Sequence, residues 1–141
     1  MRSSAWLKND NEFPPGGKLF RSERRFSVWA YSVSHSQLLL RATRSGDERR
    51  IDLLFKPVEA VKTRMDYDGL VVRCATAGER EFVLRETGAA AHNRVFFLET
   101  DDACDYVVAS AMGWQADDLG DRDPSALASF PPASDPARLL S

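Results

Sequence analysis

The sequence predicts a mainly β protein: a small β-barrel or β-sandwich of seven antiparallel strands, closed by one C-terminal α-helix. Two observations carry this prediction. Segments rich in β-branched and aromatic residues follow one another through residues 26–99, separated by polar turns. After them, Thr100-Asp101-Asp102 places capping and acidic side chains where the free N–H groups of a helix would lie. At 141 residues, the chain fits a single domain.

The most distinct local signal is Asp68-Gly69, which lies between alternating β-branched flanks and predicts a tight hairpin turn. Pro57 cannot donate a backbone hydrogen bond, so the strand should end, bulge or lie at an edge of the sheet there. The inward residues of the hairpin are expected to be core: Val61, Met65, Leu70, Val72 and Cys74. The seven expected strands are 26–35, 37–43, 51–55, 58–67, 70–76, 81–86 and 94–99.

Two segments depend on how a local pattern is interpreted. Residues 81–86 follow a turn at Ala77-Gly78-Glu79 and are expected to form a strand with Phe82 and Leu84 inward. Residues 102–116 are expected to form the closing helix. The acidic residues at its start would stabilise the N-terminus of a helix, and they have no comparable role in front of a strand. An eighth strand is the alternative, since Tyr106, Val108, Ser110 and Met112 occupy every second position, as residues on one face of a strand do.

Three parts of the chain differ in composition. Residues 1–19 are expected to be an irregular N-terminal arm, anchored by Trp6 and Phe13. Residues 20–118 are expected to form one β-barrel domain with its closing helix. Residues 119–141 are rich in Pro and Asp and are expected to be a mobile or surface-hugging tail.

The formal net charge of −2 argues against a nucleic-acid partner, which normally meets a strongly basic face. The charge is unevenly placed. Residues 1–100 contain 17 Lys/Arg and 13 Asp/Glu, whereas residues 101–141 contain 2 Lys/Arg and 8 Asp/Glu. A polar partner or internal neutralisation would explain this imbalance equally well.

Cysteine content and apolar runs bear on the compartment. Two cysteines are too few for a disulfide framework, so we expect free thiols. The N-terminal residues lack the apolar run of a secretory signal, and no segment is long and apolar enough to span a membrane. We therefore expect a cytoplasmic protein without integral membrane association.

Two stretches carry a resemblance to a known superfold. SQLLLRATRSGDERRIDLLFKPVEAVKTRMDYDGLVV and RVFFLETDDACDYVVASAMGW resemble the middle strands and the closing strand-plus-helix of the pleckstrin-homology-like superfold, over roughly residues 26–116. The resemblance implies a non-enzymatic platform for lipid headgroups, peptides or proteins. Members that bind phosphoinositides carry Lys and Arg around the first hairpin, and Ser34-His35-Ser36-Gln37 at the matching position has none.

No arrangement of residues indicates catalysis. His35 and His92 fall in expected loops, and the linear order brings neither to a nucleophile. Cys74 is expected to be a buried structural thiol. Cys104 would gain acidity at a helix N-terminus, but the neighbouring aspartates oppose this. We therefore expect no enzyme activity.

Two charged clusters are expected to be solvated turns. Asp117, Asp118, Asp121 and Asp123 lack the calcium-loop pattern, so no metal ion is expected there, and no cofactor-binding motif is present elsewhere. The arginines Arg41, Arg44, Arg49 and Arg50 are interrupted by Asp47 and Glu48 and are expected to be solvated as well.

These observations favour a non-catalytic interaction module that binds a protein or peptide. The partner would add a strand at the exposed sheet edge near Pro57, or pack into a groove between an edge strand and the helix. An acidic regulatory inhibitor or immunity-type protein, which masks a basic surface on a toxin or enzyme, is the first alternative. Small-ligand or lipid-headgroup binding is the second. The candidate partner-binding residues are Trp6, Arg24, Arg25, Trp29, Tyr31 and Trp114.

Overall fold

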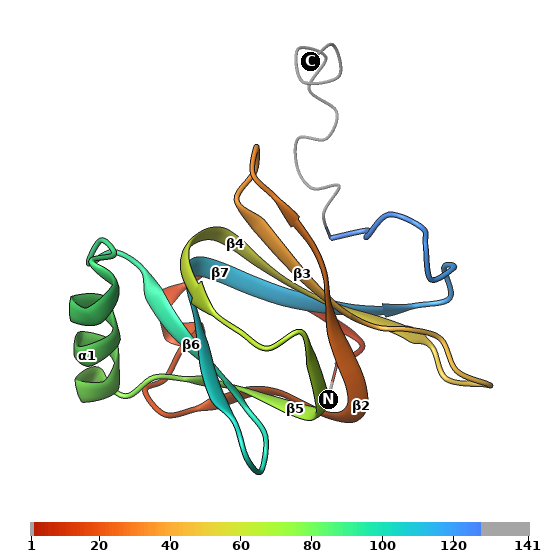
Figure 1. The fold of residues 1–141 in the computed structure, drawn as a ribbon, viewed down its shortest axis with the longest axis horizontal. Coiled ribbons are helices and arrows are strands. Elements are labelled where there is room, and N and C mark those ends of the chain that lie inside the picture. Colours follow the sequence, from red (N-terminus) through yellow and green to blue (C-terminus); the bar gives the residue numbers. More distant parts are fainter. Residues whose placement is uncertain (1, 128–141) are drawn as a thin grey trace.

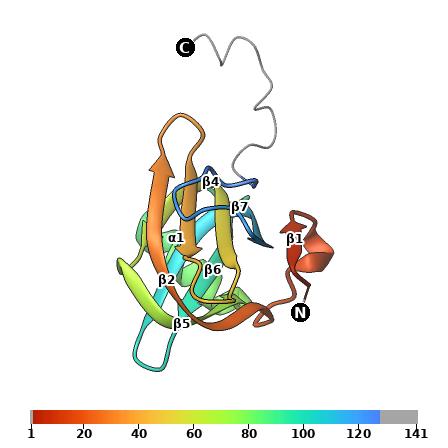
Figure 2. The ribbon, with the colours of Figure 1, turned by 90° about the vertical axis from the view of Figure 1, so that its right-hand side faces the viewer.

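A single antiparallel sheet curls into a barrel in the computed structural model, which describes residues 2–127 (Figures 1 and 2). The strands are β1 (Ser4–Leu7), β2 (Lys18–Ser32), β3 (Gln37–Ala42), β4 (Arg50–Lys62), β5 (Asp66–Cys74), β6 (Arg94–Glu99) and β7 (Cys104–Asp117). The helices are the 3-10 turn η1 (Asp10–Glu12) and the α-helix α1 (Ala77–Thr87). The predicted fold class, mainly β with seven antiparallel strands and one α-helix, is confirmed.

The sheet closes because β7 pairs along both of its edges. The strand order is β1-β7-β4-β3-β2-β5-β6, and an additional pairing joins β6 to β7. One edge of β7 is paired with β4, from Tyr106 to Asp117. The other edge is shared by β6, which meets the first half of β7, and β1, which meets the second half.

The expected closing helix is wrong, and the alternative of a strand is right. The acidic residues after Thr100 form a turn between β6 and β7, in which the Thr100 N–H donates to the Ala103 carbonyl at 3.0 Å. Pairing on two edges satisfies the β7 backbone, and its β-branched Val107 and Val108 are fully buried on opposite faces of the sheet.

The helix lies earlier in the chain, where residues 81–86 were expected to form a strand. Thr76 caps α1 by accepting a hydrogen bond from the Glu79 N–H, and the Glu79 side chain accepts from the Thr76 N–H in return. Gly88 ends the helix in the left-handed region, at φ 72°. Phe82, expected to point inward, is exposed.

The hairpin expected at Asp68-Gly69 does not exist. β4 pairs with β3 and β7, whereas β5 pairs with β2 and β6, so the two strands are not neighbours. The chain crosses between them at residues 63–65. Gly69, at φ +81°, lies inside β5, where the register with β2 shifts between Ser22 and Arg25. Pro57 lies within β4 and is followed by a register shift, so the bulge expected near it is confirmed.

Side chains fill the barrel interior and also form two clusters outside it. The inner core contains Phe20, Phe26, Phe55, Phe96 and Trp114 among other apolar residues. A first outer cluster lies between α1 and the sheet: Ala75, Val83, Val95, Phe97 and Val108. A second, formed by Leu39, Leu54 and Leu127, packs with Trp6 over the outer face of β3 and β4.

Both ends of the described chain contribute to the second outer cluster. Part of the arm that was expected to be irregular forms β1, in which Trp6 lies opposite Gly113 of β7. A Cβ at position 113 would overlap the Trp6 ring, so glycine is required for this close approach. Residues 118–127, which we call the strap, lie over β3 and β4 and place Leu127 in the cluster. The rest of the expected tail, residues 128–141, lies outside the described residues.

The left-handed conformation of Gly69 predicts the effect of a substitution. Gly69→Ala should lower the free energy of unfolding by about 1 kcal/mol, because a Cβ is strained at this φ. Gly78→Ala is the control: it lies on α1 with open space around its Cα, and the free energy of unfolding should be unchanged or higher. Urea denaturation measures both, and equal effects at the two positions would contradict the strain at Gly69.

Candidate partner-binding site at the barrel mouth

The sheet is open at one end of the barrel. The Val28 N–H donates to the Met65 carbonyl at 2.8 Å, and the Val58 N–H donates to the Ser36 carbonyl at 2.8 Å. These two hydrogen bonds bracket an opening bounded by residues 28–36, which form the end of the β2–β3 hairpin, and residues 58–65. We call these two segments the mouth rim. The hairpin projects beyond the body of the barrel (Figures 1 and 2).

Backbone pairing is one-sided along both rim segments. Residues 29–32 of β2 pair with β3, and residues 60–62 of β4 pair with β7. Within residues 2–127, no strand pairs with the other edge of either stretch. Their outward N–H and C=O groups are therefore available to a further strand.

Exposed apolar side chains gather on the same rim. Val33 is 82% exposed, Met65 66% and Val61 42%, and Trp29 and Tyr31 are also exposed. The other exposed large apolar side chains among residues 2–127 are Phe82 and Leu119. Val61 and Met65 were expected to be core, and this is wrong because the sheet does not close around the ends of β4 and β5.

The hairpin of the rim also lacks charge. Residues 26–40 contain no Asp, Glu, Lys or Arg. Edge strands of monomeric proteins are usually protected from pairing by Lys, Pro or inward charges. This uncharged run was visible in the sequence and could have identified the hairpin as an interaction surface.

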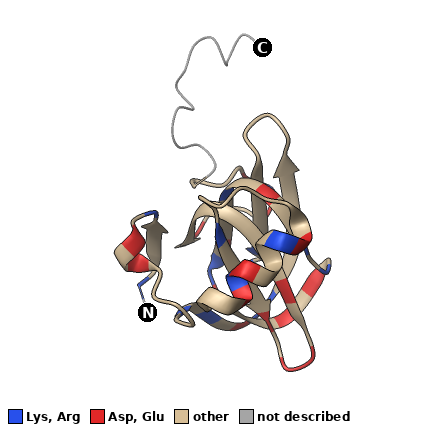
Figure 3. Cartoon of the chain, turned by 90° about the vertical axis from the view of Figure 1, so that its left-hand side faces the viewer, with Lys and Arg blue, Asp and Glu red and all other residues tan. Residues whose placement is uncertain are grey.

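An acidic cleft of about 460 Å³ adjoins the rim at Arg64. Four aspartates line it, Asp66 and Asp68 from β5 and Asp101 and Asp102 from the β6–β7 turn. Arg25 pairs with Asp68 at 2.6 Å, and Arg64 lies 3.7 Å from Asp102. These two cations offset only part of the negative charge, and the β6–β7 turn is marked by acidic residues in Figure 3.

The crossing between β4 and β5 is held by Tyr67. Its hydroxyl accepts a hydrogen bond from the Arg64 N–H at 2.9 Å and donates one to the Asp105 carboxylate at 2.7 Å. Burial, together with this bond to Asp105, raises the pKa of Tyr67 to about 12. The phenol therefore stays a donor, and the rim segment has a fixed anchor.

The structure places two of the predicted site residues on the rim, on opposite faces of the hairpin. Tyr31 lies opposite Leu38, whose side chain is part of the inner core, so Tyr31 is on the inner face at the mouth. Trp29 lies on the outer face, with the Arg41 guanidinium carbon 5.2 Å from its ring centroid.

The other predicted residues have structural contacts. Arg24 donates to the carbonyls of Thr43 and Arg49 and thereby holds the β3–β4 turn. Arg25 forms ion pairs with Asp66 and Asp68, two aspartates of the acidic cleft. Trp6 packs in the second outer cluster, with Lys56 Nζ 5.2 Å from its ring centroid. Trp114 is buried in the inner core, 5.4 Å from Phe20 between centroids.

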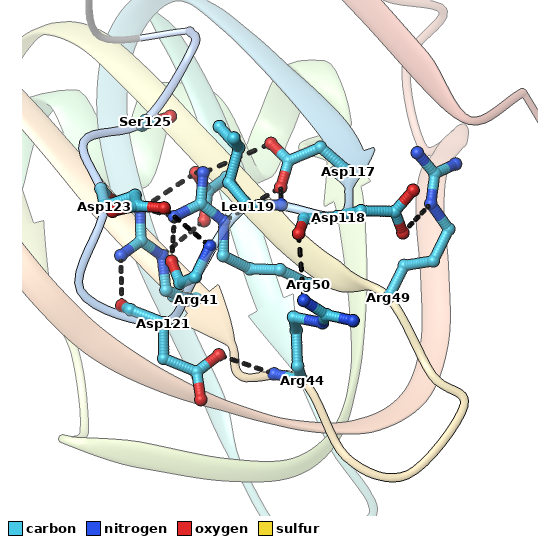
Figure 4. A network of polar contacts seen from close by, with 12 residues as sticks. Arg41, Arg44, Arg49, Arg50, Asp117, Asp118, Leu119, Asp121, Asp123 and Ser125 are labelled. Carbon is cyan, nitrogen blue, oxygen red and sulfur yellow. Dashed lines mark hydrogen bonds and ion pairs between the residues drawn. The ribbon is translucent and has the colours of Figure 1, made fainter.

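The arginines of β3 and β4 were expected to be solvated, and two of them are buried instead (Figure 4). Arg50 donates to both Asp117 oxygens at 3.0 and 3.2 Å and to the carbonyls of Gly120, Asp123 and Pro124. Arg41 donates to both Asp52 oxygens at 2.7 and 3.1 Å and to the Asp121 carbonyl at 2.7 Å. These guanidinium groups fasten the strap to the sheet.

The same contacts correct part of the expectation of a solvated acidic turn: Asp117 is buried, whereas Asp118 and Asp123 are exposed. Asp117 pairs with Arg50, Asp118 pairs with Arg49, and Asp121 accepts from the Arg44 N–H. Internal neutralisation, one of the two explanations for the uneven charge, therefore accounts for this part of the acidic excess. Within residues 2–127, no three His, Cys, Asp or Glu side chains are grouped so as to hold a metal ion.

Two further hollows lie beside α1. An open groove of about 630 Å³ is lined by Phe82, Phe97, Tyr106 and Cys104. Burial and the Glu99 carboxylate raise the pKa of Cys104, so its thiol is protonated at neutral pH and is a poor nucleophile. A second cleft, of about 670 Å³, contains Cys74, whose pKa burial raises to about 11.

No protein-family model, curated protein or solved structure matches this chain. The pleckstrin-homology-like resemblance therefore has no family match to support it, and it loses its closing strand-plus-helix, because residues 104–117 form β7 and α1 precedes β6. Among residues 2–127, no helix is long and apolar enough to cross a membrane.

Removing Arg50 should destabilise the fold strongly. Arg50→Met leaves the carboxylate of Asp117 without its buried counter-charge, and the free energy of unfolding should fall by about 3–5 kcal/mol. Arg49→Met is the matched control: its pair with Asp118 is exposed, so the change should stay below about 1 kcal/mol. Urea denaturation compares the two, and similar losses would contradict the role assigned to Arg50.

The cap of α1 predicts a pH dependence. The hydrogen bond from Arg73, with that from the Thr76 N–H, lowers the pKa of Glu79 from 4.5 to about 2. The ionised carboxylate therefore stabilises the fold above pH 4.5, and this contribution is lost as the pH falls through 2. Because the side chain is 38% exposed, solvent screening reduces the contribution to about 1 kcal/mol.

Glu79→Gln tests this, because glutamine keeps an oxygen that can accept the capping hydrogen bond from the Thr76 N–H, while it removes the charge and one of the two oxygens that accept from Arg73. The variant should be less stable than the parent by about 1 kcal/mol at neutral pH, and the difference should close between pH 4.5 and 2. Urea denaturation across that range is the measurement. A difference that does not change with pH would show that the charge has no part in it.

Proposed function

We propose that this protein is a non-catalytic interaction module that binds a protein or peptide partner at the mouth rim. The observation that carries the proposal is the coincidence of unpaired backbone edges with exposed apolar side chains at residues 28–36 and 58–65. Apolar surface at a barrel opening with free hydrogen-bonding groups is suited to another polypeptide. The proposal does not rest on the pleckstrin-homology-like resemblance, because residues 104–117 form a strand in place of the closing helix of that superfold.

The alternatives have weaker support. An acidic inhibitor was suggested by the excess of Asp beyond residue 100, and Asp117 and Asp118 of that excess are already paired with arginines. A ligand inside the barrel would have to displace the core side chains that fill it. The hollows beside α1 are open surface features, and one of them reaches the rim only at Lys62.

Charged substitutions on the rim test the proposed site. Val33→Asp and Met65→Asp each place a charge on an exposed apolar side chain, and each should abolish capture of the protein that the parent retains from a cell lysate. Leu119→Asp, on the strap, and Phe82→Asp, in the groove beside α1, are matched controls in exposure and should retain it. Quantitative mass spectrometry of the captured proteins, at low salt and at about 0.5 M salt, is the measurement.

Each variant must first unfold at the same urea concentration as the parent, so that loss of capture reports on the surface. Capture that survives both rim substitutions and fails with Phe82→Asp would move the site to the groove beside α1 and overturn the proposal. Capture lost equally in all four variants would also overturn it. A partner released from the parent at about 0.5 M salt and held equally by both rim variants would favour the acidic inhibitor instead.

A further inference from the structure

We infer that the partner binds as an extended segment that adds a strand to the free edge of β4 at residues 59–62, and that it carries a Lys or Arg beside its apolar residues. This inference rests on the proposed function and specifies the mode and the chemistry of the partner. Three features support it: the geometry of the free edge, the faces of the exposed side chains and the charge next to the rim.

The free edge of β4 is already held in strand conformation. Residues 60–62 keep their register with β7, where Ala60 lies opposite Val108 and Lys62 opposite Tyr106. On the other edge the ladder stops at the hydrogen bond from Val58 to Ser36, because the β2–β3 hairpin ends there. An added segment would continue the sheet from this point, so it would order little of the protein on binding.

The side chains of this edge explain why the segment would be apolar at alternate positions. Val61 lies opposite Val107, a residue of the inner core, so Val61 points to the inner face of the barrel mouth. Tyr31 lies on that inner face of the sheet as well. Every second side chain of an added strand would point to this face, where exposed apolar groups would receive it.

The charge next to the rim indicates the basic residue. Arg64 of the rim also lines the acidic cleft, and its Nη2 donates to the Asp102 carbonyl at 3.3 Å. Asp66 follows Met65 directly in the chain, so the aspartates begin where the apolar rim ends. A Lys or Arg at one end of the bound segment would complement the remaining negative charge.

A short segment suits this edge better than a second copy of the chain. The free stretch covers residues 59–62, and the projecting hairpin lies beside it. Two such edges paired with each other would bury much less surface than a stable dimer requires. A flexible peptide can reach the edge past the hairpin, whereas another barrel would have to approach with its own hairpin in place.

Peptides selected by display against the full 141-residue chain provide the probe. Random heptapeptides are selected on the parent, and those that fail to bind Met65→Asp but still bind Leu119→Asp are synthesised. The selected sequences should alternate apolar residues, carry a Lys or Arg at one end and lack Pro in the centre. Their affinity is then measured for variants with a single backbone N-methyl group at each position.

Strand addition predicts a period of two in the N-methyl scan. Alternate N–H groups of an added strand point at the β4 edge, so methylation at those positions should weaken binding about tenfold or more, while methylation at the intervening positions should change it less than about twofold. Asp102→Asn should weaken binding several-fold at low salt and have little effect at about 0.5 M salt, because the contact is electrostatic.

Other outcomes overturn the inference. N-methyl effects with a helical period or with no period would exclude strand addition, and selected peptides that are acidic would exclude the assigned charge. If no selected peptide depends on Met65, the edge is not a peptide site. A parent dimer in sedimentation experiments that Val33→Asp dissociates would assign the edge to a second copy.

The proposed function and this inference can fail separately. If the rim variants lose the lysate partner but the N-methyl scan shows no alternation, the rim remains the binding surface and strand addition is wrong. If the rim variants keep the lysate partner, the proposed function is wrong whatever the peptides show.

Discussion

Hydrogen bonding along both edges of β7 holds this barrel together. The strand joins β4 on one side to β6 and β1 on the other, so it closes the ring and attaches the N-terminal segment to it. Its residues alternate between the inner core, where Val107 and Met112 lie, and the outer face, where Val108 packs beneath α1. A helix over the same residues would leave β4 and β6 without a common neighbour, and the sheet would remain open.

The outer face of the sheet is stabilised by charge as well as by apolar packing. Arg41 and Arg50 are buried on β3 and β4, and carboxylates and strap carbonyls satisfy their guanidinium groups. Burying cations is costly unless each is paired and fully hydrogen-bonded, and here Asp52, Asp117 and the carbonyls of the strap supply those partners. Asp117 at the end of β7, with Asp118 and Asp121 of the strap, therefore contacts arginines of the same chain.

The mouth rim contrasts with the rest of the molecule. At the rim, two strand edges are bracketed by single hydrogen bonds at Val28 and Val58, have no strand partner between them among residues 2–127, and lie next to exposed apolar side chains. The absence of charge in residues 26–40 leaves the β2–β3 hairpin of the rim without the usual protection of an edge strand, whereas the other rim segment carries Glu59, Lys62 and Arg64. Surface of this kind promotes aggregation of an isolated protein, and it provides a binding site in a protein that pairs with another chain.

The sequence by itself determined the class of the fold. The alternation of apolar residues along a strand and the interruption of regular pairing at Pro57 are local properties of the chain. It also contained two signals for features that were not predicted. The Thr76 and Glu79 capping pair indicates the start of α1, and the uncharged residues 26–40 indicate an interaction surface on the β2–β3 hairpin. Of the candidate site, only Trp29 and Tyr31 were identified among the exposed residues of the rim.

Only the tertiary structure decided which strands pair, because pairing joins segments that are distant in sequence and alternation does not specify the neighbour. For this reason residues 104–117 became a strand, and Asp68-Gly69 lies within β5, opposite a register shift in β2, rather than in a turn. The exposure of Val61 and Met65 has the same origin: their pattern is that of core residues, and they are exposed because the barrel does not close around them. An unpaired edge is a property of the whole sheet, and no local pattern in β4 encodes it.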